Sequence, residues 1–175
     1  MATRLERALM ATAVVVNAAT CGAAAAEQPD STQRTAQIQF VPGSEQQWVA
    51  AAVEGAARRL RDPRCQEVLS DFTDAQGRTL AAGLTERGVS PTDHLRTVWF
   101  LDGRGYPACA KRSTDAFSVT GGRLVFVCPT LLRRSVGKHD EILMIHEVLH
   151  TMGLGENPPK SDDITNQVAK RCGAF

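Results

Sequence analysis

The chain has 175 residues, of which 43% are hydrophobic and 22% are charged, and its formal net charge is +1. This composition is typical of one soluble globular domain. A net charge this small argues against nucleic acid or an anionic membrane surface as a partner.

The first 26 residues are typical of a secretory signal peptide. Arg4 and Arg7 form a basic start, residues 8–19 are small and apolar, and an A-x-A cleavage site ends at Ala26. The apolar stretch is too short for a transmembrane helix, and no later segment is apolar enough to span a bilayer. Cys21 leaves a lipoprotein as the alternative, although the residues before it lack the large aliphatic side chain of such signals. We expect cleavage after Ala26 and a periplasmic or secreted protein.

The segment that follows begins as a polar stretch and then shows regular apolar spacing. Residues 27–35 are polar and are expected to form a disordered linker. Alternating residues predict strands, and apolar residues at helical spacing between breaks such as Asp62-Pro63 predict helices. The expected elements are a strand at 36–40, a helix from Ser44 to about Leu60, shorter helices at 65–72 and 79–86, and a strand at 97–101.

A Gly-Gly pair at 121–122 separates two further strand patterns, at 116–119 and 124–128. Both glycines tolerate positive φ, so a tight β-hairpin is expected. A final helix is expected over about 161–172, because apolar residues recur on one of its faces. The sequence therefore predicts an α+β fold, with a small antiparallel or mixed sheet packed on helices, in a single domain over residues 36–175.

Four cysteines follow the signal peptide, and an even number in an exported protein predicts two disulfides. No C-x-x-C pair is present, which argues against a cysteine-rich zinc site. Four cysteines allow three pairings. A bridge from Cys172, at the end of the final helix, to Cys65 closes a long loop, and long loops gain most in the chain-entropy model. We therefore favour Cys65–Cys172 and Cys109–Cys128.

The most apolar stretch after the signal peptide contains H-E-x-x-H, formed by His146, Glu147 and His150. Apolar spacing predicts a buried helix over about 140–152, which Gly153 would stop. Residues four apart lie on one helix face, so both imidazoles can bind one zinc ion (Zn2+). Glu147 is then placed as general base for a water bound to the zinc. The alternative is a core helix whose histidines are satisfied by hydrogen bonds alone.

A catalytic zinc takes three protein ligands and keeps one open position. Glu156 lies three residues after Gly153, and the glycine lets the chain turn so that the carboxylate reaches back to the metal. We therefore expect Glu156 to be the third ligand. The alternatives are a solvated loop carboxylate or a partner for Lys160, with Asp162 and Asp163 as other candidate ligands.

The segment from His146 to Glu156 reads H-E-x-x-H-x-x-G-x-x-E, which resembles the zincin metallopeptidases, and among them the metzincin pattern H-E-x-x-H-x-x-G-x-x-(H or D). The resemblance covers about a dozen residues. It implies a zincin-like fold, zinc bound by His146 and His150, Glu147 as catalytic base and Gly153 as the turn. The glutamate at the third position and the absence of a following Met-turn are differences. A longer string, H-E-V-L-H-T-M-G-L-G-E-N-P-P, also resembles small bacterial envelope proteins of unknown function.

The expected function is that of a secreted zinc-dependent metallopeptidase. Glu147 would take a proton from the zinc-bound water as it attacks the carbonyl of a peptide bond, and would pass it to the leaving amine. A peptide or protein substrate rests on analogy with the family. The alternatives are a non-catalytic zinc-binding or envelope interaction module and a metal-free structural domain.

Three other polar residues are candidates for a role in a site. Tyr106 is the only tyrosine and could stabilise an oxyanion, but its Gly/Pro-rich surroundings favour the surface. His139 precedes the metal motif and is expected to be exposed. His94 is expected in a loop, without an identifiable partner.

Overall fold

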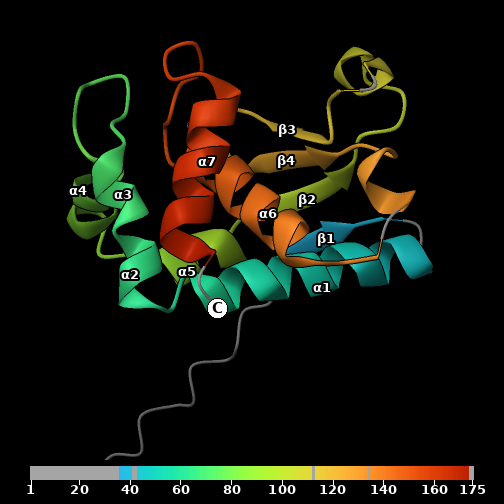
Figure 1. Cartoon of the computed structure of the whole chain (residues 1–175), viewed down its shortest axis with the longest axis horizontal. Helices are drawn as coiled ribbons and strands as arrows, with labels where there is room; N and C mark the ends of the chain where they lie inside the picture. Colours follow the sequence, from blue (N-terminus) through green and yellow to red (C-terminus); the bar gives the residue numbers. More distant parts are fainter. Residues whose placement is uncertain (1–35, 41–42, 112, 134, 174–175) are drawn as a thin grey trace, which may run out of the picture. The chain divides into compact units, whose positions relative to one another are not determined.

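A computed structural model describes residues 36–40, 43–111, 113–133 and 135–173 (Figure 1). The expected signal peptide, its cleavage site at Ala26, Cys21 and the linker at 27–35 lie outside these residues. The described residues form an α+β fold with a four-stranded sheet, which confirms the predicted class.

The sheet is mixed rather than antiparallel, with strand order β1-β2-β4-β3. The three strands β1 (Gln37–Gln39), β2 (Trp99–Asp102) and β4 (Leu124–Val127) are parallel to one another. The edge strand β3 (Ala116–Ser118) runs antiparallel to β4. The Gly-Gly pair joins these two strands, so the predicted hairpin is confirmed, and β3 becomes an outer edge of the sheet.

The described helices are α1 (Ser44–Arg59), α2 (Pro63–Gln66), α3 (Val68–Asp71), α4 (Leu80–Glu86), α5 (Pro91–Arg96), α6 (Lys138–Thr151) and α7 (Ser161–Cys172), with 3-10 turns η1 (Pro107–Ala110) and η2 (Leu131–Arg133). Among them, α1 packs on β1 and α6 packs on β3 and β4. The single helix expected at 65–72 is two short helices, and α5 was not expected. None of the helices in the described ranges is long and apolar enough to cross a membrane.

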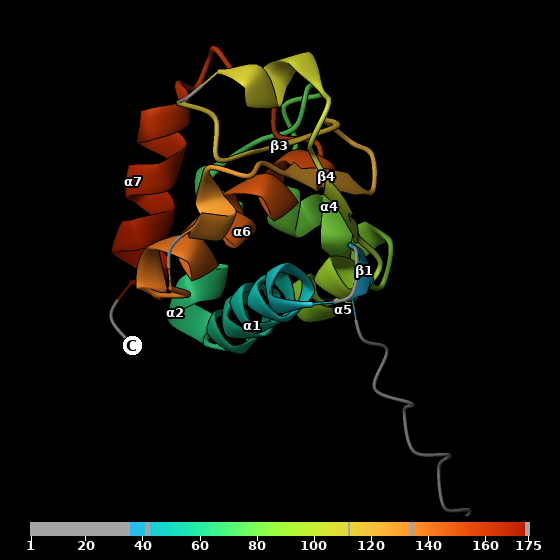
Figure 2. The same cartoon turned by 90° about the vertical axis from the view of Figure 1, so that its right-hand side faces the viewer.

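The centre of the fold is α6, which is buried along most of its length. Its neighbours are α1, α7 and the strands β3 and β4 (Figure 2). In β4, Val125 and Val127 are fully buried and Leu124 is exposed. Phe126 is buried as well, because the rings of Tyr106 and Phe117 pack against it. On the other side, α1 approaches closely at Gly55, where an added Cβ would lie 2.3 Å from Oε1 of Glu141 on α6. A buried helix of this kind holds its polar side chains in fixed positions.

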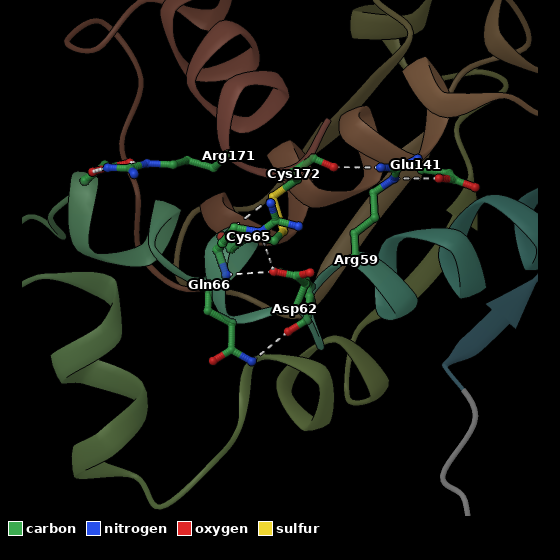
Figure 3. The surroundings of a disulfide bond; sticks show 10 residues. Arg59, Asp62, Cys65, Gln66, Glu141, Arg171 and Cys172 are labelled. Carbon is green, nitrogen blue, oxygen red and sulfur yellow. Dashed lines mark hydrogen bonds and ion pairs between the residues drawn. A yellow bond between two sulfur atoms is a disulfide. The ribbon is translucent and has the colours of Figure 1, made fainter. Parts of the chain in front are cut away.

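Two disulfides join Cys65 to Cys172 and Cys109 to Cys128, which is the pairing favoured from the sequence. The first ties the end of α7 to α2 (Figure 3). Arg59 reinforces this junction, because its guanidinium donates to the carbonyl of Cys172 and to the carboxylate of Glu141, each at 2.6 Å. Two disulfides indicate that the protein folds in an oxidising compartment.

Removing the Cys65–Cys172 bridge should cost more stability than removing Cys109–Cys128. The two bridges span 107 and 19 residues, and the chain-entropy model gives the longer loop about 1.5 kcal/mol more of stabilisation at 25 °C. The double alanine variants of each pair, unfolded in denaturant, measure this difference. If removing Cys109–Cys128 lowered the free energy of unfolding more, loop-closure entropy would not be the main source of the stabilisation by these disulfides.

Candidate metal centre

The H-E-x-x-H residues lie in the last two turns of α6 and are all buried. His146 is 2% exposed, Glu147 4% and His150 6%. The helix ends where expected, because Gly153 adopts φ 117° and its N–H donates to the carbonyl of His150 at 3.0 Å. That φ lies in a region that favours glycine, so the sharp turn after the helix depends on this residue.

The two histidines and Glu156 form one group. The Nε2 atoms of His146 and His150 lie 3.0 Å apart. One ring nitrogen of each histidine and one carboxylate oxygen of Glu156 all lie within 4.8 Å of one another. This group could hold a metal ion. Glu156 is exposed, whereas the histidines are buried, so the carboxylate closes the group from the solvent side.

The turn that carries Glu156 is anchored on both sides of Gly153. Leu154 is 1% exposed and its backbone forms a β-bridge with Asp74. A Cβ added to Gly153 would lie 3.2 Å from the Cβ of Asp74, so the two segments are in contact. Because Leu154 is buried and the turn is packed against Asp74, the position of Glu156 two residues later is constrained.

Each histidine is also oriented through its second ring nitrogen. The Nδ1 of His146 lies 2.9 Å from the hydroxyl of Thr165 on α7, and the Nδ1 of His150 lies 2.8 Å from the carbonyl of Leu154. Such partners fix the ring orientation of metal-binding histidines. Burial first, and then the neighbouring His150, lower the pKa of His146 to about 4. His146 is therefore neutral near pH 7, as a metal ligand must be.

The side chain of Glu147 makes its hydrogen bond to the edge strand β3. The hydroxyl of Ser118 on β3 donates to Oε2 of Glu147 at 2.8 Å. Burial raises the pKa of Glu147 to about 7; the bond from Ser118 lowers this pKa and the charge of Glu156 raises it. A carboxylate with a pKa near neutrality is suited to take up and release protons.

A pocket of about 110 Å³ connects these groups. Its lining comprises the two histidines, both glutamates, and residues of β3, of the hairpin turn and of the start of α7: Ala116, Phe117, Ser118, Thr120, His146, Glu147, His150, Glu156 and Ser161. The lining contains two carboxylates and no lysine or arginine. The pocket therefore favours a small group that carries no negative charge.

The competing candidates lie elsewhere. Asp162 and Asp163 are exposed in the first turn of α7, outside the group of possible ligands. Among the ion pairs of the described residues, none joins Glu156 to Lys160. Tyr106 is 46% exposed and its ring packs 4.5 Å from that of Phe126, between ring centroids, away from the metal group's pocket. A surface position for Tyr106 is therefore confirmed.

The prediction that His94 lies in a loop without a partner is wrong. It lies in α5, not in a loop, is 9% exposed, and its Nε2 is 2.9 Å from the hydroxyl of Thr151 on α6. Ser90 caps α5 by accepting a bond from the N–H of Asp93, and Pro91 occupies the first helical position. This Ser-Pro start was a readable signal for a helix. His139 is exposed, as expected.

Acid should destabilise the metal-free protein partly through His94. Burial, followed by Arg87 and Arg123, lowers its pKa to about 4 from 6.5. Between these values the unfolded chain binds a proton that the folded chain does not, so the stability present above pH 6.5 is lost as the pH falls toward 4. The loss should reach about 3 kcal/mol. His94→Gln, which does not titrate, should flatten the stability profile over this interval; an unchanged profile would contradict the assignment.

Two imidazoles and one carboxylate form a donor set that suits zinc and other divalent transition metals. Their positions fit a metal ion with three protein ligands, because the three donor atoms converge and a pocket remains beside them. The comparisons with family models, curated proteins and solved structures find no match for the chain, so the chemistry of the site rests on these residues and their geometry.

Proposed function

We propose that the protein is a zinc-dependent metallopeptidase, acting in the periplasm or outside the cell. The observation that carries this proposal is the buried Glu147, which lines the same pocket as the convergent donor atoms of His146, His150 and Glu156. A structural metal site needs no such carboxylate. A hydrolytic site needs one group that accepts a proton beside the metal.

The number of ligands supports a catalytic rather than a structural ion. Three protein ligands leave an open fourth position, as in catalytic zinc sites, whereas structural zinc is closed by four, usually including cysteines. All four cysteines of the described residues are joined in disulfides. The pocket provides the space in which a water molecule and a carbonyl group can meet.

A zinc ion bound there would polarise a carbonyl group and lower the pKa of water. Glu147 accepts the proton that the attacking water loses and donates it to the leaving amine. Ser118 holds Oε2 of Glu147, which leaves the other oxygen for this exchange. Thr165 and the carbonyl of Leu154 keep the two imidazoles oriented. A cation held by the neighbouring ligands would favour the ionised form of Glu147, the form that accepts a proton.

The pocket limits the substrate to a chain that lies across it. Its volume of about 110 Å³ is well below the roughly 300–1,000 Å³ of pockets that enclose a small-molecule ligand. It can admit the scissile group and one small side chain, while the remainder of the substrate stays on the surface. An amide bond in an extended peptide meets this requirement.

Replacing Glu156 with alanine should weaken zinc binding at least about tenfold, since the site loses one of three ligands and its only liganding negative charge. Glu156→Asp or Glu156→His should recover part of the affinity. Asp162→Ala and Asp163→Ala are matched controls from the exposed start of α7 and should bind zinc normally. Competition with a chromogenic chelator measures the zinc affinity of these five variants against that of the wild-type protein. Loss of affinity in an Asp variant, with Glu156→Ala unaffected, would move the third ligand to α7.

The proposal is tested by incubating the oxidised, zinc-loaded protein with a mixed peptide library and identifying cleavage products by mass spectrometry. Cleavage should stop when a chelator removes the metal and return when zinc is added back. Peptides with small uncharged residues at the cleaved bond should be preferred. A protein that binds zinc at the predicted site and cleaves no peptide would instead be a non-catalytic zinc-binding module.

A further inference from the structure

The contact between α6 and α7 includes one polar pair at the metal group. The hydroxyl of Thr165 lies 2.9 Å from Nδ1 of His146, and Thr165 comes from a helix that provides none of the three possible ligands. The other histidine has a different partner, because the Nδ1 of His150 is hydrogen-bonded to the backbone carbonyl of Leu154. This difference between a hydroxyl and a carbonyl determines where the protons of the two rings lie.

The proton of His150 is fixed. A carbonyl oxygen only accepts hydrogen bonds, so Nδ1 of His150 carries the proton and donates it to Leu154. In a neutral ring, Nε2 of His150 then holds a lone pair. That lone pair points to Nε2 of His146 at 3.0 Å. Two nitrogens at this separation repel each other unless a proton or a cation lies between them.

Two arrangements satisfy this requirement, and they place the proton of His146 on opposite nitrogens. Without a metal, Nε2 of His146 carries the proton and donates it to His150, so Nδ1 needs a donor. With a metal, both Nε2 atoms offer lone pairs, so Nδ1 of His146 carries the proton and needs an acceptor. A hydroxyl supplies either one, because it has one donor hydrogen and two acceptor lone pairs.

We propose that Thr165 is a positioning residue that serves His146 in both tautomers, by donating to Nδ1 in the metal-free protein and accepting from it in the metal-bound protein. The inference rests on the metal group proposed above. On metal binding, His146 loses the proton of Nε2 to solvent and takes one from solvent at Nδ1, so the ring stays neutral and the pair releases no net proton. The hydroxyl of Thr165 only rotates. A carbonyl at this position could only accept a hydrogen bond, so it would suit Nδ1 of His146 in the metal-bound state and not in the metal-free state.

The consequence is that metal can bind without rearrangement of the helices. The same 2.9 Å contact is a hydrogen bond in either state, and no described buried side-chain nitrogen or oxygen lacks a partner. We therefore expect the backbone around α6 and α7 to be the same before and after metal binding.

The test combines spectroscopy of the wild-type protein with two substitutions. The chain has four histidines, so their ring nitrogens can be assigned in long-range 1H–15N spectra. In metal-free protein His146 should be protonated on Nε2 and His150 on Nδ1; with zinc, both should be protonated on Nδ1. Thr165→Val removes the hydroxyl and should weaken zinc binding about tenfold. Thr165→Ser should restore most of the affinity, and Thr85→Val, an exposed change on α4, should have no effect.

Different results separate the possible failures. Metal-free His146 protonated on Nδ1 would overturn the role given to Thr165, and so would a Thr165→Val protein that binds zinc as tightly as wild type. A wild-type protein that binds no zinc would refute the proposed function and this inference with it. The wild-type tautomers are measured without any substitution, so a Thr165→Val protein that fails to fold does not block the test.

Discussion

His146→Ala and His150→Ala should each abolish tight zinc binding by the folded protein. Each change removes one of two imidazole nitrogens that lie 3.0 Å apart and leaves too few ligands to hold the ion. The loss should exceed about a hundredfold, because changes to residues that only hydrogen-bond a ligand already cost about ten- to a hundredfold. Chelator competition, followed by metal analysis of the dialysed protein, measures the effect.

The chain supplies a matched control for these substitutions. His139 lies in the first turn of the same helix but is exposed and outside the pocket. His139→Ala should therefore bind zinc like the wild-type protein. Circular dichroism establishes whether each variant is folded. If the His139 variant lost zinc as completely as the His146 and His150 variants, binding would not be specific to the H-E-x-x-H group.

Glu147→Gln should separate binding from catalysis. Glutamine fills the same volume and can still accept the bond from Ser118, but it cannot take up a proton. Zinc affinity should stay nearly unchanged, while the rate of peptide cleavage should fall about 10²- to 10⁴-fold, the usual contribution of general acid–base catalysis. The rate of cleavage of one peptide substrate is measured at saturating zinc, by quenching the reaction at successive times.

A second glutamate serves as the control for the rate measurement. Glu54 lies on α1, is exposed and is not among the residues that line the pocket, so Glu54→Gln should leave the rate unchanged. If Glu147→Gln released zinc as readily as the histidine variants, Glu147 would be a ligand and the assigned roles would be wrong. If it kept both zinc and full activity, the proton acceptor would be another group.

Local patterns in the sequence were sufficient for α6 and for the turn after it. The spacing of His146 and His150, the apolar residues around them and Gly153 together predict a buried helix that ends at a sharp turn, and the structure contains both. The hairpin of β3 and β4 follows in the same way from alternation and two glycines. These features depend on residues close in sequence, where helical and strand periodicity are informative.

The groups that orient the site could not be read from the sequence, because they come from distant segments. Ser118 reaches Glu147 across 29 positions, and His94 reaches Thr151 across 57. A lone serine or histidine carries no periodic signal, and only the sheet order and the packing of α5 and α7 on α6 bring these partners together. Thr165 was similarly part of an expected helix without an expected contact. The parallel pairing of β1, β2 and β4 was likewise undetermined, since strand patterns do not specify direction.

The most direct test of the central claim is a crystal structure of the zinc-soaked protein, with the ion located by anomalous scattering at the zinc edge. The account predicts one zinc bound by Nε2 of His146, Nε2 of His150 and a carboxylate oxygen of Glu156, with a fourth position open to the pocket lined by Glu147 and Ser118. A fourth protein ligand closing that position, or a zinc bound through Asp162 or Asp163 in place of Glu156, would contradict it.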